Sequence, residues 1–258
     1  MISIKQISHY WDAQPCNIRH SAKPLFSKEY FDEVEARKRF VEPHTETFAD
    51  FAKWRNKNVL EIGCGIGTDA VRFARAGARY VGVDVSERSV DIAVKRFKLF
   101  GLRGTFHVAN AERLSEIVPI KPFDLVYSFG VIHHTPHPSK VVNEVHKFMH
   151  DRSVFRLMVY AKQSWKSWMI EAGLCQPEAQ SGCPLVRTYD RDTISKLLKN
   201  FRIVKMSQAH IFPFNVNSYI HQNYVMEPWF SQMPIPMFEM LEKRLGWHLL
   251  IECKKINK

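Results

Sequence analysis

The chain has 258 residues, of which 45% are hydrophobic, and it carries a formal net charge of +11 at pH 7. This length and composition suffice for one well-packed core, so we expect a single main domain with additions. The sequence contains no run of eighteen apolar residues and no N-terminal apolar stretch, which argues against a membrane-spanning helix and a signal peptide. Its five cysteines lack a Cys-x-x-Cys spacing, so a cytoplasmic location is expected.

Residues 1–57 precede the first predicted strand and form an expected N-terminal cap. Within them, Phe31, Val34 and Val41 have helical spacing, which predicts a helix over residues 29–41. The preceding segment, residues 10–21, is too polar for a core strand and too aromatic for a tail. It either lines a pocket or is a surface loop held by Trp11.

The next segment combines a short apolar strand, a glycine-rich turn and a helix. The strand at residues 59–62 runs into Gly63, Gly65 and Gly67, and a helix is predicted over residues 69–76. Glycines let the backbone approach a ligand closely, and the helix N-terminus adds free N–H groups. The spacing is not the G-x-G-x-x-G of a dinucleotide site, and the carboxylate of Glu61 suits a cationic ligand better than a pyrophosphate.

Three further strands follow at regular intervals. The second, residues 80–86, ends near Asp84, about 20 residues past the glycines, where nucleotide-binding folds place an acid for the ribose hydroxyls. The third ends in a turn at Asn110, and the fourth, which begins at Phe123, leads into a loop with His133 and His134.

In this order and spacing, the four segments resemble the motifs of class I S-adenosylmethionine-dependent methyltransferases of the small-molecule type. The resemblance implies an α/β fold, with a Rossmann-like, doubly wound, seven-stranded sheet whose last strand is antiparallel. It implies an N-terminal helical cap at residues 1–57 and a methyltransferase domain at residues 58–258. Insertions are expected after strands five and six, at about residues 161–189 and 208–246.

The resemblance also implies the cofactor, S-adenosylmethionine, with S-adenosylhomocysteine as the product. Asp84 takes the ribose role, and Asn110 stands where many relatives have an aspartate, although its amide oxygen can still accept a hydrogen bond from the adenine amino group. The cofactor residues expected on this basis are Glu61, Gly63, Cys64, Gly65, Gly67, Asp84, Val85, Asn110, Ala111, Glu112, Ser128, Phe129 and His133. A Rossmann-like domain for another ligand is the alternative.

The sequence departs from the family after the fourth motif. Relatives usually end the next helix in a Pro-Gly-Gly turn, whereas residues 148–153 lack both residue types, so a turn based on Asp151 and Ser153 is expected. A fifth strand at residues 154–160 then ends at Tyr160, at the edge where open α/β sheets place ligands. Strands at residues 201–207 and 247–253 complete the sheet.

The acceptor is expected to contact the cap and the insertions. In relatives the cap closes over the cofactor and lines the substrate pocket, which makes Asn17 and Arg19 substrate candidates, with His210 and Tyr219 from the second insertion. That insertion is rich in aromatic residues, methionine and proline. It forms a satellite core under a lid, the floor of the pocket, or a surface for an apolar partner or a membrane.

Methyl transfer is a displacement at carbon from a neutral leaving group, so a general base is needed only when the acceptor must lose a proton. The catalytic candidates are His134, His20 and Tyr160. His133, His134 and His137 lie close together on a loop with no acidic partner at a suitable spacing, so no metal site is expected.

The sequence therefore predicts a methyltransferase that modifies an oxygen or nitrogen atom of a small-molecule or lipid- or glycan-linked metabolite. An RNA methyltransferase is an alternative because of the basic charge, but the lysines and arginines are dispersed, so nucleic acid is not the expected partner. A cofactor-binding module without turnover is the other alternative. Peripheral membrane contact and the oligomeric state stay open.

Overall fold

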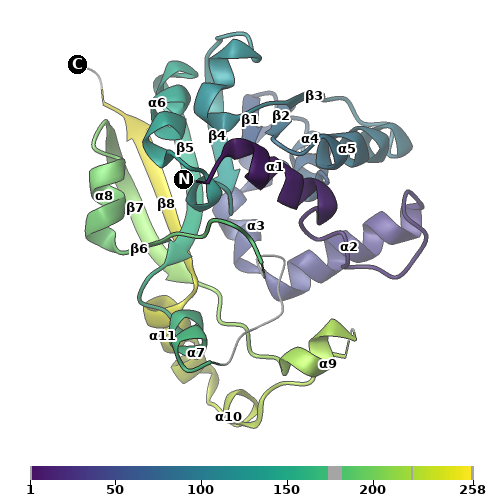
Figure 1. Cartoon of the computed structure of the whole chain (residues 1–258), viewed down its shortest axis with the longest axis vertical. Helices are drawn as coiled ribbons and strands as arrows, with labels where there is room; N and C mark the ends of the chain where they lie inside the picture. Colours follow the sequence, from purple (N-terminus) through teal and green to yellow (C-terminus); the bar gives the residue numbers. More distant parts are fainter. Residues whose placement is uncertain (1, 174–181, 222, 257–258) are drawn as a thin grey trace.

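The fold is organised by a sheet of mostly parallel strands. The computed structural model describes residues 2–173, 182–221 and 223–256. Its strand order is β3-β2-β1-β4-β5-β8-β7, and a two-residue strand, β6, pairs with β5 off this path (Figure 1). The bounds are β1 (Asn58–Ile62), β2 (Arg79–Asp84), β3 (Thr105–Val108), β4 (Phe123–Phe129), β5 (Met149–Ala161), β6 (Thr188–Tyr189), β7 (Phe201–Ala209) and β8 (His248–Lys255). Because β8 runs antiparallel to both its neighbours, the predicted Rossmann-like sheet is confirmed, with β6 as an addition.

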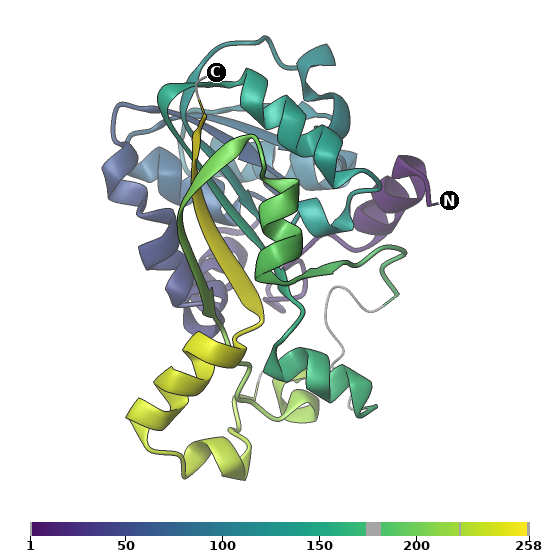
Figure 2. The same cartoon turned by 90° about the vertical axis from the view of Figure 1, so that its left-hand side faces the viewer.

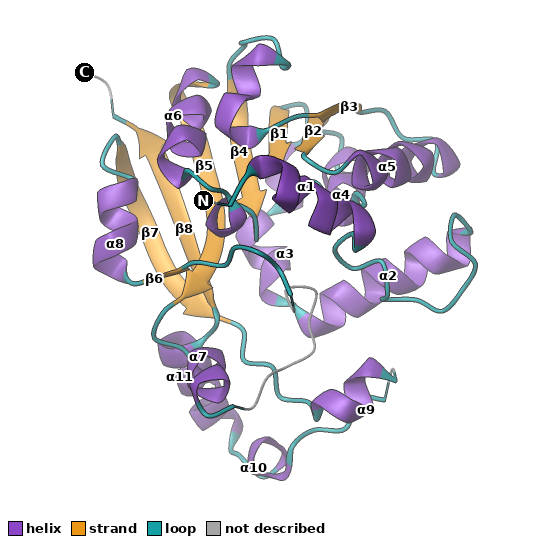
Figure 3. Ribbon diagram, viewed as in Figure 1, coloured by secondary structure: helices purple, strands orange, loops and turns teal. Residues whose placement is uncertain are grey.

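Helices cover both faces of this sheet (Figure 3). They are α1 (Ile4–Ala13), α2 (Lys28–Val41), α3 (His44–Ala49), α4 (Thr68–Arg75), α5 (Glu87–Leu99), α6 (Pro138–Lys147), α7 (Trp165–Glu171), α8 (Arg191–Leu197), α9 (Val216–Ile220), α10 (Pro228–Ser231) and α11 (Ile235–Leu245), with short 3-10 helices η1 (Phe51–Trp54), η2 (Ala111–Glu116) and η3 (Ile132–His134). One core cluster contains Val141 of α6 and Ile194 of α8, and another contains Phe73 of α4 and Trp54 of η1. The apolar strands are therefore buried from both sides, as in a doubly wound fold.

Helix α1 was not predicted from the sequence. Ser3 and Gln6 form a capping box at its N-terminus, which is the local signal that could have indicated it. The helix is fixed over the end of β2, because Ser8 donates a hydrogen bond to the carbonyl of Val85 (3.0 Å) and Ser86 donates one to the carboxylate of Asp12 (2.7 Å). The cap thus closes one side of the sheet edge at which ligands bind.

Helix α2, predicted at residues 29–41, packs into the core through Phe31 and Val34, both fully buried. A buried arginine of α5 ties it to the rest of the domain. The Arg96 guanidinium donates hydrogen bonds to the carbonyl of Phe31 (3.3 Å) and to the hydroxyl of Thr68 (3.0 Å), and it lies 3.6 Å from the carboxylate of Glu35. The position of α2 is therefore set by polar contacts as well as by apolar packing.

The turn predicted at residues 148–153 is wrong. Strand β5 already begins at Met149, and the pairing with β4 changes register between Phe123 and Leu125. The hydroxyl of Ser153 donates to the carbonyl of Phe123 (2.5 Å) and accepts the N–H of His150 (2.8 Å). From one pair to the next, β5 advances from Met149 to Val154 while β4 advances only from Phe123 to Leu125, so the extra residues form a bulge within β5, held by Ser153, in place of a separate turn.

Both insertions begin at the carboxyl ends of strands, β5 and β7, and their helices α7, α9, α10 and α11 gather below that end of the sheet (Figures 1 and 2). Residues 174–181 of the first insertion lie outside the described residues. Phe230 is buried between Trp165 and Phe238, with ring centroids 5.5 and 5.7 Å away, which forms a satellite core. Among the described helices, none combines the length and apolar character that crossing a membrane requires.

We expect Arg96→Ala to lower the free energy of unfolding by roughly 3–5 kcal/mol, because it leaves buried polar partners unpaired. The neighbouring Lys95→Ala removes an exposed ion pair with Asp91 (2.7 Å) on the same helix, and its effect should stay below about 1 kcal/mol. Urea unfolding followed by circular dichroism measures both. Equal effects of the two substitutions would contradict this account of how α2 is held.

Candidate active site

One cavity of about 650 Å³ lies at the carboxyl ends of β1, β2, β4 and β5. Its volume is in the range of cavities that bind cofactors or drug-sized ligands. Ile62, Asp84, Phe129 and Tyr160 line it from the four strand ends, and α1, α2 and the segment after β7 supply the other walls. Open parallel sheets bind ligands at this edge, so the cavity is the candidate active site.

The glycine turn after β1 forms one wall of the cavity. Gly63, Gly65 and Gly67 all have positive φ, at 78°, 51° and 77°. A Cβ atom at Gly63 would lie 2.0 Å from the side chain of Val131, whereas one at Gly65 would meet no atom within 4 Å. Gly63 is therefore required for packing, and Gly65 lets the backbone approach a ligand in the free space beside it.

Asp84, at the end of β2, connects this turn to the start of α5. Its Oδ2 atom accepts the N–H of Gly65 (2.8 Å) and its Oδ1 atom accepts the N–H of Ser86 (2.9 Å). Burial raises the pKa of Asp84, and these backbone N–H groups oppose the rise. A carboxylate offers about four lone-pair positions, so the two backbone contacts leave room for both hydroxyls of a ribose.

A group of buried charges lies beside the glycine turn. The ammonium of Lys38 lies 2.8 Å from the carboxylate of Asp69, which also accepts a hydrogen bond from Tyr127 (3.2 Å). Burial lowers the pKa of Lys38, but the charges of Asp69 and Glu42 outweigh it, so the net shift is upward. The lysine is therefore charged and compensates Asp69.

Glu61 is the acid of the first motif, and it is 4% exposed. Its carboxylate accepts a hydrogen bond from Tyr80 (2.6 Å). Burial and the charge of Asp69 hold the pKa of Glu61 well above its usual range, against the hydroxyl of Tyr80 and the charge of Lys38. The charged form of a carboxylate in this environment is stabilised most by a cationic partner. The amino group and the sulfonium of S-adenosylmethionine are such cations.

The opposite end of the cavity is lined by histidines and aromatic rings. His134 donates from Nδ1 to the carbonyl of Leu185 (2.8 Å), and its ring lies edge-on to Trp11, with centroids 5.3 Å apart. Burial lowers the pKa of His134 to about 4, and it holds the pKa values of His210 and His248 well below their usual range. All three rings are therefore neutral at pH 7.

Most of the residues predicted from the sequence line this cavity. They are Asn17, Arg19, His20, Glu61, Gly63, Cys64, Gly65, Asp84, Val85, Asn110, Ala111, Phe129, His134, Tyr160, His210 and Tyr219. Their individual roles stay predictions, because the structure contains no ligand. Asn110 accepts the N–H of Glu112 (2.9 Å), which forms the turn expected at the end of the third strand.

Four of the predicted cofactor residues do not line the cavity. Gly67 is the N-cap of α4. Glu112 accepts the backbone N–H of His137 (2.6 Å), and Ser128 is fully buried within β4. His133 is also fully buried, with its ring 3.8 Å from that of Tyr160. The motif sequence places these residues near the cavity, but the side chains of Glu112, Ser128 and His133 are buried in the protein, and Gly67 has none.

Other lining residues were not singled out as site residues from the sequence: Trp11, Lys38, Glu42, Trp247 and His248. Two of them carried a local signal: Lys38 stands on the apolar face of α2, at helical spacing from Val34, and Trp11 lies in the aromatic segment at residues 10–21. The others come from separate parts of the chain and meet only in the folded protein.

This fold and cavity define a class I S-adenosylmethionine-dependent methyltransferase. The profile of the family described as "Methyltransferase domain" matches residues 34–203, more than half of the chain, so the protein belongs to this family and S-adenosylmethionine is its methyl donor.

Comparison with characterised proteins agrees with this assignment. The ubiquinone biosynthesis O-methyltransferase of Pseudomonas syringae pv. tomato is 31% identical over 98 residues, which are 38% of this chain and 42% of that protein. The chain therefore spans less than half the length of this curated relative.

Two solved structures share the fold over nearly their whole length. Magnesium protoporphyrin IX methyltransferase from Synechocystis PCC 6803, with bound S-adenosylhomocysteine, has a TM-score of 0.61 at 14% identity and covers 98% of this chain and 99% of its own. Geranyl diphosphate C-methyltransferase from Streptomyces coelicolor A3(2) has a TM-score of 0.63 at 12% identity. The match covers 98% of this chain and 97% of that protein. At these identities the likeness shows the fold alone.

We expect Asp84→Asn to weaken binding of S-adenosylhomocysteine by about 2 kcal/mol, or roughly thirtyfold, because a charged acceptor of two ribose hydroxyls becomes a neutral amide. Isothermal titration calorimetry measures this. Asp124→Asn is a matched control, since Asp124 also accepts a backbone N–H, that of Asn58 (2.8 Å), at the start of β4. Equal affinities of the Asp84 variant and the parent would mean that the ribose binds elsewhere.

Acidification should destabilise the protein through His134. Its pKa is about 4 when folded and near 6.5 in the unfolded chain, so between these values only the unfolded state binds the proton. The contribution of His134 to the free energy of unfolding is therefore fully present above about pH 6.5, and it decreases as the pH falls toward 4. When the pH is lowered from 7 to 5, the free energy of unfolding of the parent should fall by about 2 kcal/mol more than that of His134→Gln. Urea unfolding at the two pH values measures this difference. An equally steep loss in the variant would contradict the buried, neutral state of this ring.

Proposed function

We propose that the protein transfers the methyl group to the oxygen of a hydroxylated, largely apolar small molecule. The observation that carries this proposal is the composition of the acceptor end of the cavity, where the neutral rings of His134, His210 and His248 lie among Tyr160 and Trp247. Neutral imidazoles hydrogen-bond to a hydroxyl group, and aromatic rings bury an apolar body. The name of the curated relative, an O-methyltransferase, supports the same acceptor atom.

The charges that line the cavity disfavour a protonated amine as the acceptor. Arg37 lines the same wall and donates hydrogen bonds to the backbone oxygen (3.1 Å) and the hydroxyl (3.3 Å) of Tyr219. The guanidinium of Arg37 places a positive charge on this wall, which favours a hydroxyl that is losing its proton, whereas the charge of Lys38 is compensated by Asp69. An acidic hydroxyl such as a phenol fits this field best.

His134 has the geometry to orient such a hydroxyl. Since its Nδ1 atom donates to the carbonyl of Leu185, the Nε2 atom carries the lone pair, and Nε2 is buried with no hydrogen-bond partner among the described residues. A hydroxyl acceptor could donate its proton to this nitrogen. With a pKa of about 4, however, the ring is a weak base, so we assign it to positioning the acceptor.

S-adenosylmethionine supplies the methyl group on a cationic sulfur. The residues of the protein hold and align the two substrates: Asp84 and the glycine turn bind the nucleoside, Glu61 faces the cationic part, and the ring-lined end excludes water. Correct alignment of two reactants is worth roughly 7–11 kcal/mol in model reactions, which is enough to account for most of the rate without a strong base.

We expect the purified protein to label phenolic acceptors from methyl-labelled S-adenosylmethionine. Matched pairs of compounds on the same apolar body, one with a hydroxyl and one with an amino group, separate oxygen from nitrogen as the acceptor atom, and mass spectrometry of the products locates the label. Total RNA and an anionic control lacking a hydroxyl complete the panel. The proposal predicts label on oxygen only, and label confined to amines or to RNA would contradict it.

A further inference from the structure

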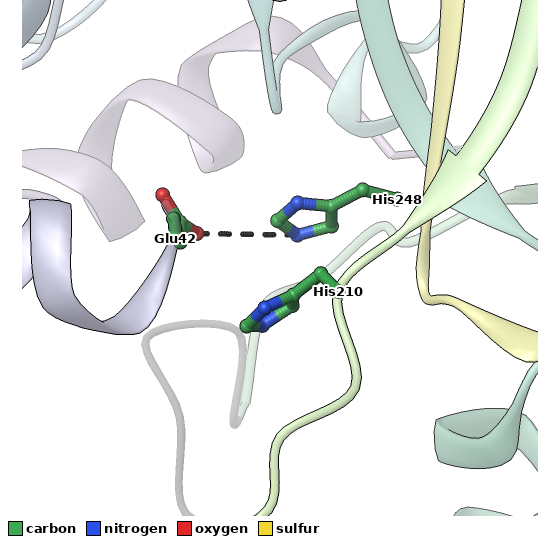
Figure 4. Close-up of side chains that lie close together, drawn as sticks. All are labelled: Glu42, His210 and His248. Carbon is green, nitrogen blue, oxygen red and sulfur yellow. Dashed lines mark ion pairs between the residues drawn. The ribbon is translucent and has the colours of Figure 1, made fainter. Parts of the chain in front are cut away.

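We propose that Glu42, His210 and His248 form a binding site for a divalent transition-metal ion at the acceptor end of the cavity. Each of the three residues offers one ligand atom, and these atoms lie within 4.8 Å of one another (Figure 4). All three residues also line the cavity. No local spacing in the sequence indicates this site, because its three residues are far apart in the chain.

The three ligands come from segments far apart in the sequence. Glu42 is the C-cap of α2, His210 follows directly after β7, and His248 is the first residue of β8. Figure 4 shows the two rings one above the other, with the carboxylate of Glu42 facing them. The ring centroids of His210 and His248 lie 4.5 Å apart, and Nε2 of His248 is 3.9 Å from Oε1 of Glu42.

The distances between these three side chains favour a metal ion bound between them over a direct hydrogen bond from one to another. A gap of 3.9 Å is too long for a hydrogen bond between the ring of His248 and Glu42. Metal–nitrogen and metal–oxygen bonds of about 2.0–2.2 Å place the ligand atoms of one ion roughly 3–4 Å apart, so only a small closure is needed.

The chemistry of the donors selects the kind of ion. Two imidazole nitrogens and one carboxylate oxygen are typical ligands of zinc, iron, manganese or cobalt, whereas calcium and magnesium prefer oxygen ligands alone. Three protein ligands leave a coordination position open toward the cavity, as in catalytic rather than structural metal sites.

Both rings are held from behind by further contacts. Nδ1 of His248 lies 2.9 Å from Nε2 of His44, and the ring of His210 packs against the ring of His44, with centroids 5.5 Å apart. Such outer contacts fix the tautomer and orientation of histidines that bind metals. His210 also has a left-handed backbone, with φ of 74°, which is uncommon for this residue type.

The left-handed backbone of His210 is kept in place by its neighbours. Its N–H donates to the carboxylate of Glu242 (3.0 Å), and its carbonyl accepts the N–H of Trp247 (2.8 Å). Strained residues persist only where the surroundings determine them, and they are concentrated at functional sites. Here the strain directs the ring of His210 toward His248.

The ion would help a hydroxyl acceptor to lose its proton, which the neighbouring histidines, as weak bases, do poorly. A hydroxyl in the open position would release its proton to water more readily, since a divalent ion strongly lowers the pKa of a bound oxygen. This role rests on the proposed hydroxyl acceptor, whereas metal binding itself does not depend on it.

Cobalt(II) is the probe for this site, because its visible spectrum reports the ligands and geometry. We expect the metal-free protein, prepared by dialysis against a chelator, to bind one cobalt ion with a spectrum of low coordination number, and zinc to displace it. His248→Ala and His210→Ala should each abolish this spectrum, and His44→Ala should weaken binding by about 10–100-fold.

Two variants serve as controls. His150→Ala removes a histidine near the start of β5, at the other end of the sheet, and Cys183→Ser removes the thiol that lies 3.5 Å from His134. Both should bind cobalt as the parent does, and every variant should bind S-adenosylhomocysteine if it is folded. The proposal is overturned if cobalt does not bind, or if it binds equally well to His248→Ala. Retained S-adenosylhomocysteine binding and hydroxyl methylation in that case would leave the proposed function intact.

Discussion

The carboxylate of Asp84 is the contact on which the site depends. It accepts the N–H groups of Gly65 and Ser86, so one side chain joins the turn after β1, the end of β2 and the start of α5. Ser86 in turn donates to Asp12 and so fixes the cap helix α1 over the same edge. The backbone that faces the cofactor is therefore already arranged before binding, and little conformational entropy remains to be lost when it binds.

Burial determines what each end of the cavity can bind. At the cofactor end, Lys38 already compensates Asp69, whereas Glu61 keeps a raised pKa that a bound cation would relieve. At the acceptor end the same burial keeps His134 and His248 neutral, so they serve as hydrogen-bonding or metal-binding groups. One physical cause, the removal of water, thus leaves a carboxylate that favours a cation at one end and neutral imidazoles that bind a hydroxyl or a metal ion at the other.

The sequence was sufficient for the parts of the fold and site that are local in the chain. Asp84 is the last residue of β2, and the glycine turn and Asn110 follow the ends of β1 and β3, so their place at the sheet edge could be inferred from their motifs. Glu42 and His248 are more than 200 residues apart and meet only because α2 packs beside the end of the sheet, which no local pattern records. The predicted turn at residues 148–153 failed for a related reason, since the side chain of Ser153 bonds to a strand distant in sequence.

The most direct test of this account is a crystal structure of the protein with S-adenosylhomocysteine. The account predicts that the ribose hydroxyls contact Asp84, that the amino group lies near Glu61, and that the sulfur faces the end lined by Phe129, His134 and Tyr160. A cofactor bound with its adenine among these rings, or outside the cavity, would contradict the assignment of the two ends.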